Sequence, residues 1–460
     1  MTNDIITQLA DVVGAGSVLT GDAVARRKFA WDTHDRCRAK ALVFPVSTAE
    51  VSRILSLCNA SGQTVVPFGG TTNLVQGCAT TADDIVISLE KMNTIEELDR
   101  SARTIVAQAG VTMQAAQQAA ADVGLLFPVD TGARSNCMLG GMVSTNAGGT
   151  KVIRYGMTRD SVLGLEAVLA DGTVVTSMNH FIKNNSGFDL KHLFIGSEGV
   201  LGIITRVVLQ LATQPTSHNV ALLACDSFDD VVKVLGHARD DLPNTLTGFE
   251  VMWNSFYERA VEPHGRLAAP LATGSCCYVL LESMGVNDEQ DGAAFEKTME
   301  SLLQEELVAD GLLAKSDKER DLIWAIRDEV EPFLGVARNF DVSLKSADVG
   351  VYLAAVEAAI KSEFKTAEVV GFGHLGDNNV HVSVLVDEQT EEVTQRIEEI
   401  VYARLKPYDG AISAEHGIGL EKRAYLPISR SQAEIDLMIR LKRMMDPNNI
   451  LNPGKVVDAQ

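Results

Sequence analysis

The chain has 460 residues, of which 46% are hydrophobic and 22% charged, and this composition indicates a globular protein of more than one domain. Its net charge of −21 argues against nucleic acid partners and anionic membrane surfaces, because both require a basic footprint. We find no apolar run that could span a bilayer, and Met1–Asp4 lacks the basic start of a secretory signal. Seven scattered cysteines without C-x-x-C spacing predict reduced thiols and a cytoplasmic protein.

The N-terminal region predicts a βαβ unit. Residues 41–46 read as a strand, and Ser47 with Glu50 has the spacing of a capping box at a helix start. Apolar residues then recur at helical spacing, and residues 64–68 form the next strand. The following loop, Gly69–Leu74, has paired glycines and polar side chains that suit an anion held by backbone N–H groups. Neither the Rossmann nor the Walker spacing is present, so a plain tight turn is the alternative.

A glycine-rich stretch stands out in the next part of the chain. Strands are expected at 84–89, 104–109, 161–170, 173–177 and 206–211, with a helix at 112–123. Small residues dominate between 140 and 149 and pack poorly by themselves. Such backbone is expected to lie against a large flat group, such as a ring system or a pyrophosphate, although a run of tight turns is the alternative.

After a domain boundary predicted at Gln214–Thr216, the pattern changes to an antiparallel α+β domain with helices on one face of a sheet. Strands are expected at 219–225, 246–252 and 276–282, a hairpin at 367–386, and helices at 227–238, 288–306, 318–333, 347–363, 389–406 and 432–445.

Two histidines flank the turn of the predicted hairpin. Asp377 and Asn378 suit a two-residue loop, and in that register His374 stands opposite His381, with Cβ atoms roughly 5 Å apart. Two imidazoles at this spacing could hold a divalent metal, with Glu415 as a third ligand. The alternative is two surface histidines and an unrelated Glu-His pair.

Taken together, these segments resemble the FAD-linked oxidase family, whose members bind FAD in a two-lobed α+β domain of the vanillyl-alcohol-oxidase type. The motifs that carry the resemblance are Pro67–Leu74, Pro128–Gly132, Gly140–Gly149, Arg154–Gly156, Gly196–Thr205, His374–His381, Glu415–Gly419 and Asn452–Lys455. Within the family, the chain looks like the metal-dependent D-2-hydroxyacid dehydrogenases that act on D-lactate and D-2-hydroxyglutarate. The implied domains are an FAD-binding domain at 1–215, a substrate or cap domain at 216–410, and a C-terminal segment at 411–460 that returns to the flavin.

The resemblance also implies which residues bind FAD. They are Pro67, Gly69, Gly70, Thr71, Thr72, Asn73, Leu74, Pro128, Asp130, Gly140, Gly141, Ser144, Asn146, Gly148, Gly149, Ile203 and Asn452. Some relatives attach FAD covalently through a histidine in the first glycine loop. This loop has none, so non-covalent FAD is expected.

The same resemblance implies a reaction. Zinc, or manganese, would lie on His374, His381 and Glu415, and a D-2-hydroxy acid would lose its hydroxyl proton to His416 and a hydride to the flavin N5. Arg327 would clamp the substrate carboxylate, although a solvated helix arginine is the alternative. Electrons would pass to a protein or quinone acceptor, such as electron-transfer flavoprotein, and a homodimer is conceivable.

Three positions depart from the D-2-hydroxyglutarate dehydrogenases. Those enzymes have a lysine, an asparagine and a hydroxyl residue where this chain has Asn339, Ser383 and Glu331. A dicarboxylate substrate is therefore in doubt, unless Lys345 or Arg338 replaces the missing lysine.

Other classes of protein remain as alternatives. A metal hydrolase without flavin could be built on the His, His, Glu set. A non-redox flavin transferase of the same superfamily, or a flavin-binding module without activity, would fit the glycine-rich segments.

Overall fold

The computed structural model describes residues 4–30, 37–333 and 335–459 of the chain. Residues 1–3, which belong to the stretch that argues against a secretory signal, lie outside the described residues. The chain forms two compact units. The first comprises Met1–Gly148, Gly156–Gln214 and Glu415–Gln460, and the second Gly149–Tyr155 and Pro215–Ala414. Within the described residues, no helix is long and apolar enough to cross a membrane.

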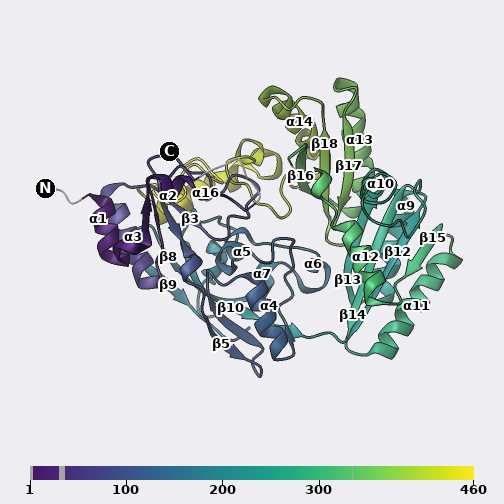
Figure 1. The fold of residues 1–460 in the computed structure, drawn as a ribbon, viewed down its shortest axis with the longest axis horizontal. Coiled ribbons are helices and arrows are strands. Elements are labelled where there is room, and N and C mark those ends of the chain that lie inside the picture. Colours follow the sequence, from purple (N-terminus) through teal and green to yellow (C-terminus); the bar gives the residue numbers. More distant parts are fainter. Residues whose placement is uncertain (1–3, 31–36, 334, 460) are drawn as a thin grey trace. The chain divides into compact units, whose positions relative to one another are not determined.

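The first lobe of the first unit, which contains the strand labelled β3 in Figure 1, is a four-stranded sheet. Its order is β1-β2-β4-β3, and β2, β4 and β3 run parallel. Its elements are α1 (Ile5–Val13), β1 (Val18–Thr20), α2 (Asp22–Ala25), β2 (Ala41–Val43), α3 (Thr48–Ser61), β3 (Val65–Phe68) and β4 (Ile85–Ser88). The βαβ unit is therefore confirmed, with β4 inserted between its two strands.

Local chemistry sets the ends of α3. The Ser47 hydroxyl accepts from the N–H of Glu50 and caps the start, and Gly62 ends the helix in the left-handed conformation. The capping box is only half formed, because the Glu50 carboxylate accepts from the N–H of Val46 rather than from that of Ser47. The buried face, with Val51 among its residues, packs under the sheet.

The second lobe is a five-stranded antiparallel sheet in the order β5-β6-β10-β8-β9. Its elements are β5 (Ile95–Asp99), β6 (Thr104–Gln108), α4 (Met113–Asp122), β7 (Leu125–Leu126), α5 (Leu139–Thr145), α7 (Thr158–Ser161), β8 (Val162–Val168), β9 (Val174–Ser177), α8 (Lys191–Phe194), β10 (Ile203–Gln210) and β11 (Ala212–Thr213). Strand β5 was not predicted, because it lies at the exposed edge of the sheet and three of its five residues are acidic.

The C-terminal segment completes the first unit. Helices α15 (Leu426–Ser429) and α16 (Gln432–Met445) precede a short extended stretch beside β3. There the N–H of Val65 donates to Ile450 O, and the N–H of Asn452 donates to Val65 O, each at 2.7 Å. An isolated parallel bridge thus joins Val65 to Leu451, which lies far away in the chain.

The second unit is a seven-stranded antiparallel sheet in the order β15-β12-β14-β13-β17-β18-β16. Its elements are α6 (Val152–Tyr155), β12 (Ser217–Cys225), α9 (Phe228–Asp241), β13 (Leu246–Trp253), α10 (Asn254–Ala260), β14 (Cys277–Gly285), α11 (Asp288–Gln304), β15 (Asp310–Leu313), α12 (Asp317–Arg327), β16 (Ala337–Ser343), α13 (Val349–Glu363), β17 (Glu368–Gly373), β18 (Asn379–Leu385) and α14 (Glu391–Ala403). The α+β class is confirmed.

Helices cover both faces of this sheet, so the prediction of a single covered face is wrong. Val370 lies in the core cluster that includes residues of α10 and α12. The adjacent Gly371 faces Leu353 of α13, and successive residues of a strand point to opposite faces. We call the face covered by α10 and α12 face A, and the face covered by α13 face B.

Candidate functional site

The two hairpin histidines are brought together by a register that differs from the predicted one. Phe372, not His374, pairs with His381 across β17 and β18. The turn is longer than two residues, because Leu375–Asp377 forms a 3-10 turn and Asn378 takes the left-handed conformation at φ 70°. The N–H of Asn379 closes this turn on His374 O at 3.1 Å. The predicted register is therefore wrong by two residues, while the ring centroids of the two histidines still lie 5.4 Å apart.

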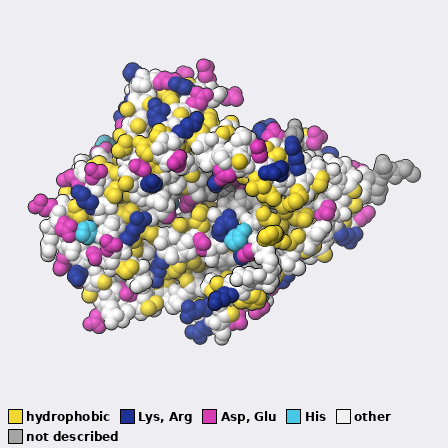
Figure 2. Space-filling view, turned by 180° about the vertical axis from the view of Figure 1, so that it is seen from behind, with side chains coloured by type: hydrophobic (Ala, Val, Ile, Leu, Met, Phe, Trp, Pro, Cys, Tyr) yellow, Lys and Arg dark blue, Asp and Glu magenta, His cyan; other side chains and the backbone are white. Residues whose placement is uncertain are grey.

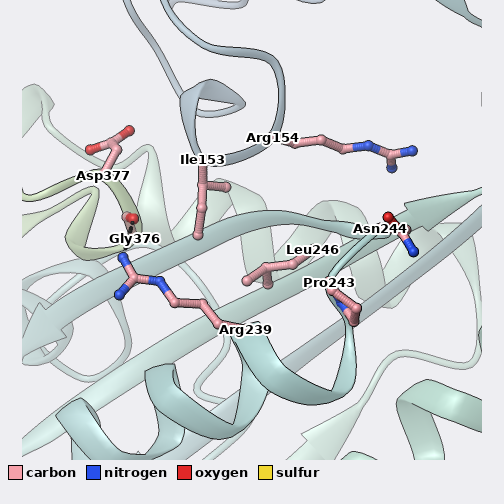
Figure 3. Close-up of a pocket in the computed structure, with 8 residues that line it drawn as sticks. All are labelled: Ile153, Arg154, Arg239, Pro243, Asn244, Leu246, Gly376 and Asp377. Carbon is pink, nitrogen blue, oxygen red and sulfur yellow. Dashed lines mark hydrogen bonds between the residues drawn. The ribbon is translucent and has the colours of Figure 1, made fainter.

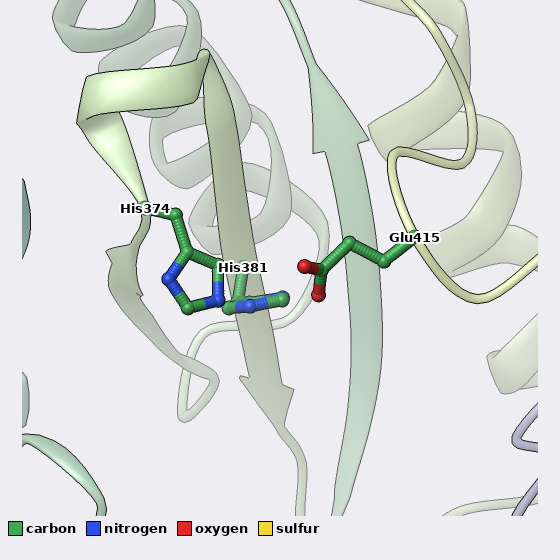
Figure 4. Close-up of side chains that lie close together, drawn as sticks. All are labelled: His374, His381 and Glu415. Atoms are coloured by element: carbon green, nitrogen blue, oxygen red, sulfur yellow. The ribbon is translucent and has the colours of Figure 1, made fainter. Parts of the chain in front are cut away.

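Glu415 lies beside this pair. It follows Ala414, the last residue of the second unit, whose N–H donates to Asp341 O. Potential ligand atoms of His374, His381 and Glu415 all lie within 4.8 Å of one another (Figure 4). The alternative of unrelated surface histidines is wrong, since His374 is only 6% exposed. The donor set of two imidazoles and one carboxylate is one that zinc accepts in catalytic sites.

A buried carboxylate that the sequence did not single out orients His374. The Nδ1 atom of His374 lies 2.8 Å from Glu250 Oε1, and the Nε atom of Arg327 donates to Glu250 Oε2 at 2.6 Å. Burial raises the pKa of Glu250, but the charges of His374 and Arg327 outweigh burial and lower it to about 2. A carboxylate that accepts from one ring nitrogen leaves the other as ligand, which is the usual arrangement of a metal-binding histidine.

Glu250 could have been suspected from one signal in the sequence. It is the single charge inside Leu246–Trp253, an otherwise uncharged segment. Met252, two residues further, pairs with Phe372, which places Glu250 on face A of the sheet with His381.

Arg327 is not a solvated helix arginine. It ends α12 with 5% exposure, and its Nη2 atom lies 3.2 Å from Nε2 of His374. The carboxylate clamp predicted for it remains a prediction. His416 follows Glu415 directly, and with Asp341 these two residues form a second group whose potential ligand atoms lie within 4.8 Å. The role of His416 as a proton acceptor also remains a prediction.

Two of the three departing positions lie together, and the third lies on the surface. Asn339 pairs with Ser383 across β16 and β18, and the Ser383 hydroxyl donates to Asn339 Oδ1 at 2.6 Å. This pair lies on face A, two residues along the strand from His381. Glu331 instead accepts from Arg266 on the surface.

Arg338 does not replace the missing lysine. It neighbours Asn339 and therefore points to face B, where its Nη2 atom lies 2.5 Å from Glu398 of α14. Lys345 lies beyond the end of β16, at the start of the turn before α13. The strand that carries Asn339 thus presents a neutral hydrogen-bonding pair beside His381.

The first glycine loop has the geometry of an anion site. Among the described residues, none accepts a hydrogen bond from the N–H groups of residues 70–74, a run of five. Thr71 takes the left-handed conformation at φ 54°, and Asn73 Oδ1 accepts from the N–H groups of Val75 and Gly77. Consecutive N–H groups without acceptors in a turn form a concave anion-binding nest, which fits the pyrophosphate of FAD.

The second glycine-rich segment is ordered rather than a run of turns. Residues 139–145 form α5, and the left-handed Asn146 ends it. This helix was not predicted, because glycines are unfavourable in helices. They are present because the helix packs closely: a Cβ on Gly140 would lie 2.6 Å from the Cβ of Ala109. A Cβ on Gly141 would meet nothing within 4 Å, although its Cα lies beside Gly69. Gly141 therefore opens onto free space at the first glycine loop, as a flat ring would require.

The contact of the remaining predicted cofactor residues with FAD stays a prediction. Asp130 bonds Arg134, with Oδ2 2.6 Å from Nη2. The side chain of Ile203 lies in the core. The Asn452 amide donates to Glu198 O and accepts from Lys455 Nζ, so it ties loops together. Pro67, Thr72, Leu74, Pro128, Ser144, Gly148 and Gly149 complete the set.

Glu198 is a second residue that the sequence did not single out. Its carboxylate accepts from the N–H groups of Ile418 and Gly419 at 2.7 and 2.9 Å. A Cβ on Gly417 would lie 2.7 Å from Glu198 Oε1, which explains a glycine directly after His416. The Gly196–Thr205 motif and the Glu415–Gly419 motif are thereby joined within the first unit.

A separate depression of about 570 Å³ is lined in part by the hairpin turn. Gly376, Asp377, Arg154 and Arg239 are among its lining residues (Figure 3). None of the predicted site residues lines it. Acidic and basic side chains are interspersed on the face shown in Figure 2, so the net negative charge is not gathered into one patch there.

Profiles of FAD-dependent protein families match both parts of the chain. The profile described as "FAD linked oxidases, C-terminal domain" matches residues 214–456, and the one described as "FAD binding domain" matches residues 39–177.

Two relatives cover nearly the whole chain. A probable mitochondrial D-2-hydroxyglutarate dehydrogenase of Oryza sativa subsp. japonica is 36% identical, over 99% of this chain and 82% of the relative. A D-2-hydroxyglutarate dehydrogenase of Stutzerimonas stutzeri is 34% identical, over 99% of each. Among solved structures, p-cresol methylhydroxylase with substrate bound superposes with a TM-score of 0.78 at 16% identity, over 99% of this chain and 96% of that one, which shows a shared fold. With profiles over both parts and relatives at this identity along its length, the chain belongs to the FAD-linked oxidase family.

Proposed function

We propose that the protein is an FAD-dependent dehydrogenase that oxidises a D-2-hydroxy acid to the 2-oxo acid. The observation that carries the proposal is the cluster of His374, His381 and Glu415 with Glu250 behind it, in a family member whose relatives are named D-2-hydroxyglutarate dehydrogenases. A hydrolase without flavin does not explain the two FAD-family profiles.

FAD supplies the two-electron chemistry of the reaction, as the acceptor of a hydride at N5. The N–H groups of residues 70–74 would bind its pyrophosphate, and the open backbone at Gly141 would lie against its ring system. Residues 69–74 contain no histidine, so we expect the FAD to be held without a covalent bond.

A divalent metal, zinc in the first instance, would be held by His374, His381 and Glu415 and would supply Lewis acidity at the substrate hydroxyl. Glu250, whose Oε1 lies 2.8 Å from Nδ1 of His374, would orient this ring towards the metal. His416 accepts the hydroxyl proton, a role that an imidazole commonly takes as a general base. Arg327 offers its guanidinium to the substrate carboxylate.

The far end of the substrate would meet the Asn339–Ser383 pair. These side chains can donate and accept hydrogen bonds but carry no charge. A D-2-hydroxy acid with a short or neutral side chain, such as D-lactate, fits this pair as well as a dicarboxylate does, and activity on a panel of substrates decides between them.

The electron acceptor, the quaternary structure and the location belong to the same proposal. We infer a protein or quinone acceptor, such as electron-transfer flavoprotein, since the chain carries no nicotinamide fingerprint. Placement in the cytoplasm and assembly as a homodimer are further parts of the proposal, and size-exclusion chromatography with light scattering tests the dimer.

The test is anaerobic reduction of the purified protein. The preparation should be yellow, and D-2-hydroxy acids, but not their L-enantiomers, should bleach the flavin band. A colourless preparation that cannot be reconstituted with FAD, or a yellow one that no acid in a panel of D- and L-2-hydroxy acids bleaches, would refute the dehydrogenase. Full activity after complete removal of metal by a chelator would refute the metal part alone.

A further inference from the structure

Three cysteines gather at one end of the sheet in the second unit. Cys277, the first residue of β14, pairs with Cys225, the last residue of β12. Cys276 precedes it, and the Sγ atoms of Cys276 and Cys277 lie 3.7 Å apart. All three thiols are free. None of them belongs to the sites described above.

Cys276 is placed as a nucleophile. It is the more accessible of the two adjacent cysteines, since it is partly exposed while Cys277 is fully buried. The backbone of Phe228, the first residue of the 14-residue helix α9, helps to lower the pKa of this thiol, as the positive end of a helix does.

The two thiols differ in acidity, and Cys276 is the one suited to make the first attack. The hydrogen bond from Cys277 lowers the pKa of Cys276 to about 7. The same bond, with burial, raises the pKa of Cys277 far above its usual range. Cys58 and Cys225, which are buried without such a bond, have pKa values raised to about 12. Only Cys276 of this set is substantially thiolate at neutral pH.

We propose that Cys276 and Cys277 form a redox modification site, in which a peroxide converts the two thiols into a reversible disulfide between adjacent residues. The Cys276 thiolate attacks a peroxide oxygen, the O–O bond breaks, and Cys276 becomes a sulfenic acid while the leaving hydroxide takes a proton to form water. The Cys277 sulfur then attacks the Cys276 sulfur, the S–O bond breaks, and the Cys277 proton leaves with the hydroxide as a second water. The two thiols lose two electrons and the peroxide gains them.

The surroundings give the disulfide a structural consequence. Cys276 O accepts from the N–H of Asn254 at 3.2 Å, and Cys277 pairs with Trp253 of β13. Trp253 stacks on Phe228, with ring centroids 5.2 Å apart. Closing the sulfur–sulfur distance to a bond must turn the peptide between the two cysteines, which strains the bond to Asn254 and disturbs the packing of Trp253. Tryptophan fluorescence therefore reports the reaction.

The experiment treats the FAD-loaded full chain with hydrogen peroxide at about pH 7.5, followed by alkylation, digestion and mass spectrometry. We expect the peptide with Cys276 and Cys277 to lose two hydrogens, to escape alkylation, and to recover both thiols in dithiothreitol. Cys276 should react about tenfold faster than Cys58.

Three variants sharpen the result. Cys277→Ser should stop at a sulfenic acid on Cys276 that dimedone traps, and Cys276→Ser should leave Cys277 reduced. Cys58→Ser, a control at a buried thiol elsewhere, should behave as the unsubstituted protein does. The proposal is overturned if peroxide leaves both cysteines alkylatable, if the bond found joins Cys225 to Cys277, or if Cys276 in the Cys277→Ser protein reacts no faster than Cys58.

Discussion

The Nδ1 atom of His374 lies 2.8 Å from Oε1 of Glu250, and both side chains are buried. If His374 binds the proposed divalent metal, Glu250→Gln should lower the affinity for that metal by about 10- to 100-fold, because the ring loses the charged acceptor that fixes its tautomer. Competition with a metallochromic chelator measures the affinity.

The control for that experiment is Glu368→Gln, which neutralises an exposed carboxylate on β17 that is paired with Arg259. It should leave metal affinity unchanged. Equal metal affinities for Glu250→Gln and the unsubstituted protein would show that Glu250 does not support metal binding. Metal binding that persists after substitution of His374 would show that His374 is not a ligand.

How much of this site the sequence could predict depends on how rare each residue pattern is. Two histidines around a turn and a Glu-His pair are uncommon, so His374, His381 and Glu415 could be chosen from the sequence alone. The sequence could raise only a suspicion about Glu250, because one carboxylate in a strand is usually exposed to solvent. Glu250 is a buried anion because Arg327, at the end of α12, and His374, just after β17, both bond to its carboxylate.

The fold shows the same division. The helix α3 was predictable, because its cap at Ser47 and its end at Gly62 are local. The register of the hairpin was not, since Asp377 and Asn378 suit a two-residue loop as well as the longer turn that forms. The helix α5 was not predictable, because its glycines do not favour a helix. Gly140 is needed there for close contact with Ala109, which lies 31 positions earlier in the chain.

A second buried carboxylate, Glu282, should stabilise the second unit. It bonds Lys151, lies 2.6 Å from Nε2 of His218, and accepts from Nε1 of Trp324 at 3.0 Å. Removal of one member of a buried ion pair leaves the other charge without compensation, so Glu282→Gln should lower the free energy of unfolding by about 3–5 kcal/mol. Urea unfolding followed by tryptophan fluorescence measures the loss.

The same residue gives a pH dependence with a definite sign. Burial raises the pKa of Glu282, but Lys151 and His218 outweigh it and lower the pKa from 4.5 to about 2. A carboxyl whose pKa is lower in the folded state contributes stability above its unfolded pKa, and loses it as the pH falls from 4.5 towards 2. That contribution is about 3 kcal/mol. The difference between Glu282→Gln and the unsubstituted protein should therefore shrink in that window, whereas Glu300→Gln, at an exposed site on α11, should show no such change.

Three glycines of the first unit test the cofactor site. A Cβ on Gly70 would lie 1.7 Å from Asn136 O, so Gly70→Ala should disrupt the loop and lose FAD together with stability. A Cβ on Gly141 or Gly132 would meet nothing within 4 Å. If the flavin lies against Gly141, Gly141→Ala should fold normally and yet release FAD more readily, while Gly132→Ala should match the unsubstituted protein. Fluorescence of released flavin and circular dichroism separate the two effects, and equal FAD retention in the Gly141 and Gly132 variants would contradict the assignment.

The neutral pair beside His381 gives a prediction about substrate choice. Asn339 lies on face A, two residues along the strand from Asp341, which pairs with His381. If the far end of the proposed substrate meets this pair, Asn339→Lys would place a cation there. We then expect it to raise kcat/KM for D-2-hydroxyglutarate relative to D-lactate by about tenfold, since a charge-assisted bond to the distal carboxylate is worth about 1.4 kcal/mol or more.

Arg338→Gln is the matched control for Asn339→Lys, because Arg338 neighbours Asn339 and points to Glu398 on face B. It should leave the ratio of the two kcat/KM values unchanged. A fall in activity on D-2-hydroxyglutarate alone would mean that Arg338 turns to hold the distal carboxylate. An unchanged ratio in the Asn339→Lys protein would mean that the substrate extends from the metal-binding residues in another direction, away from the pair formed by Asn339 and Ser383.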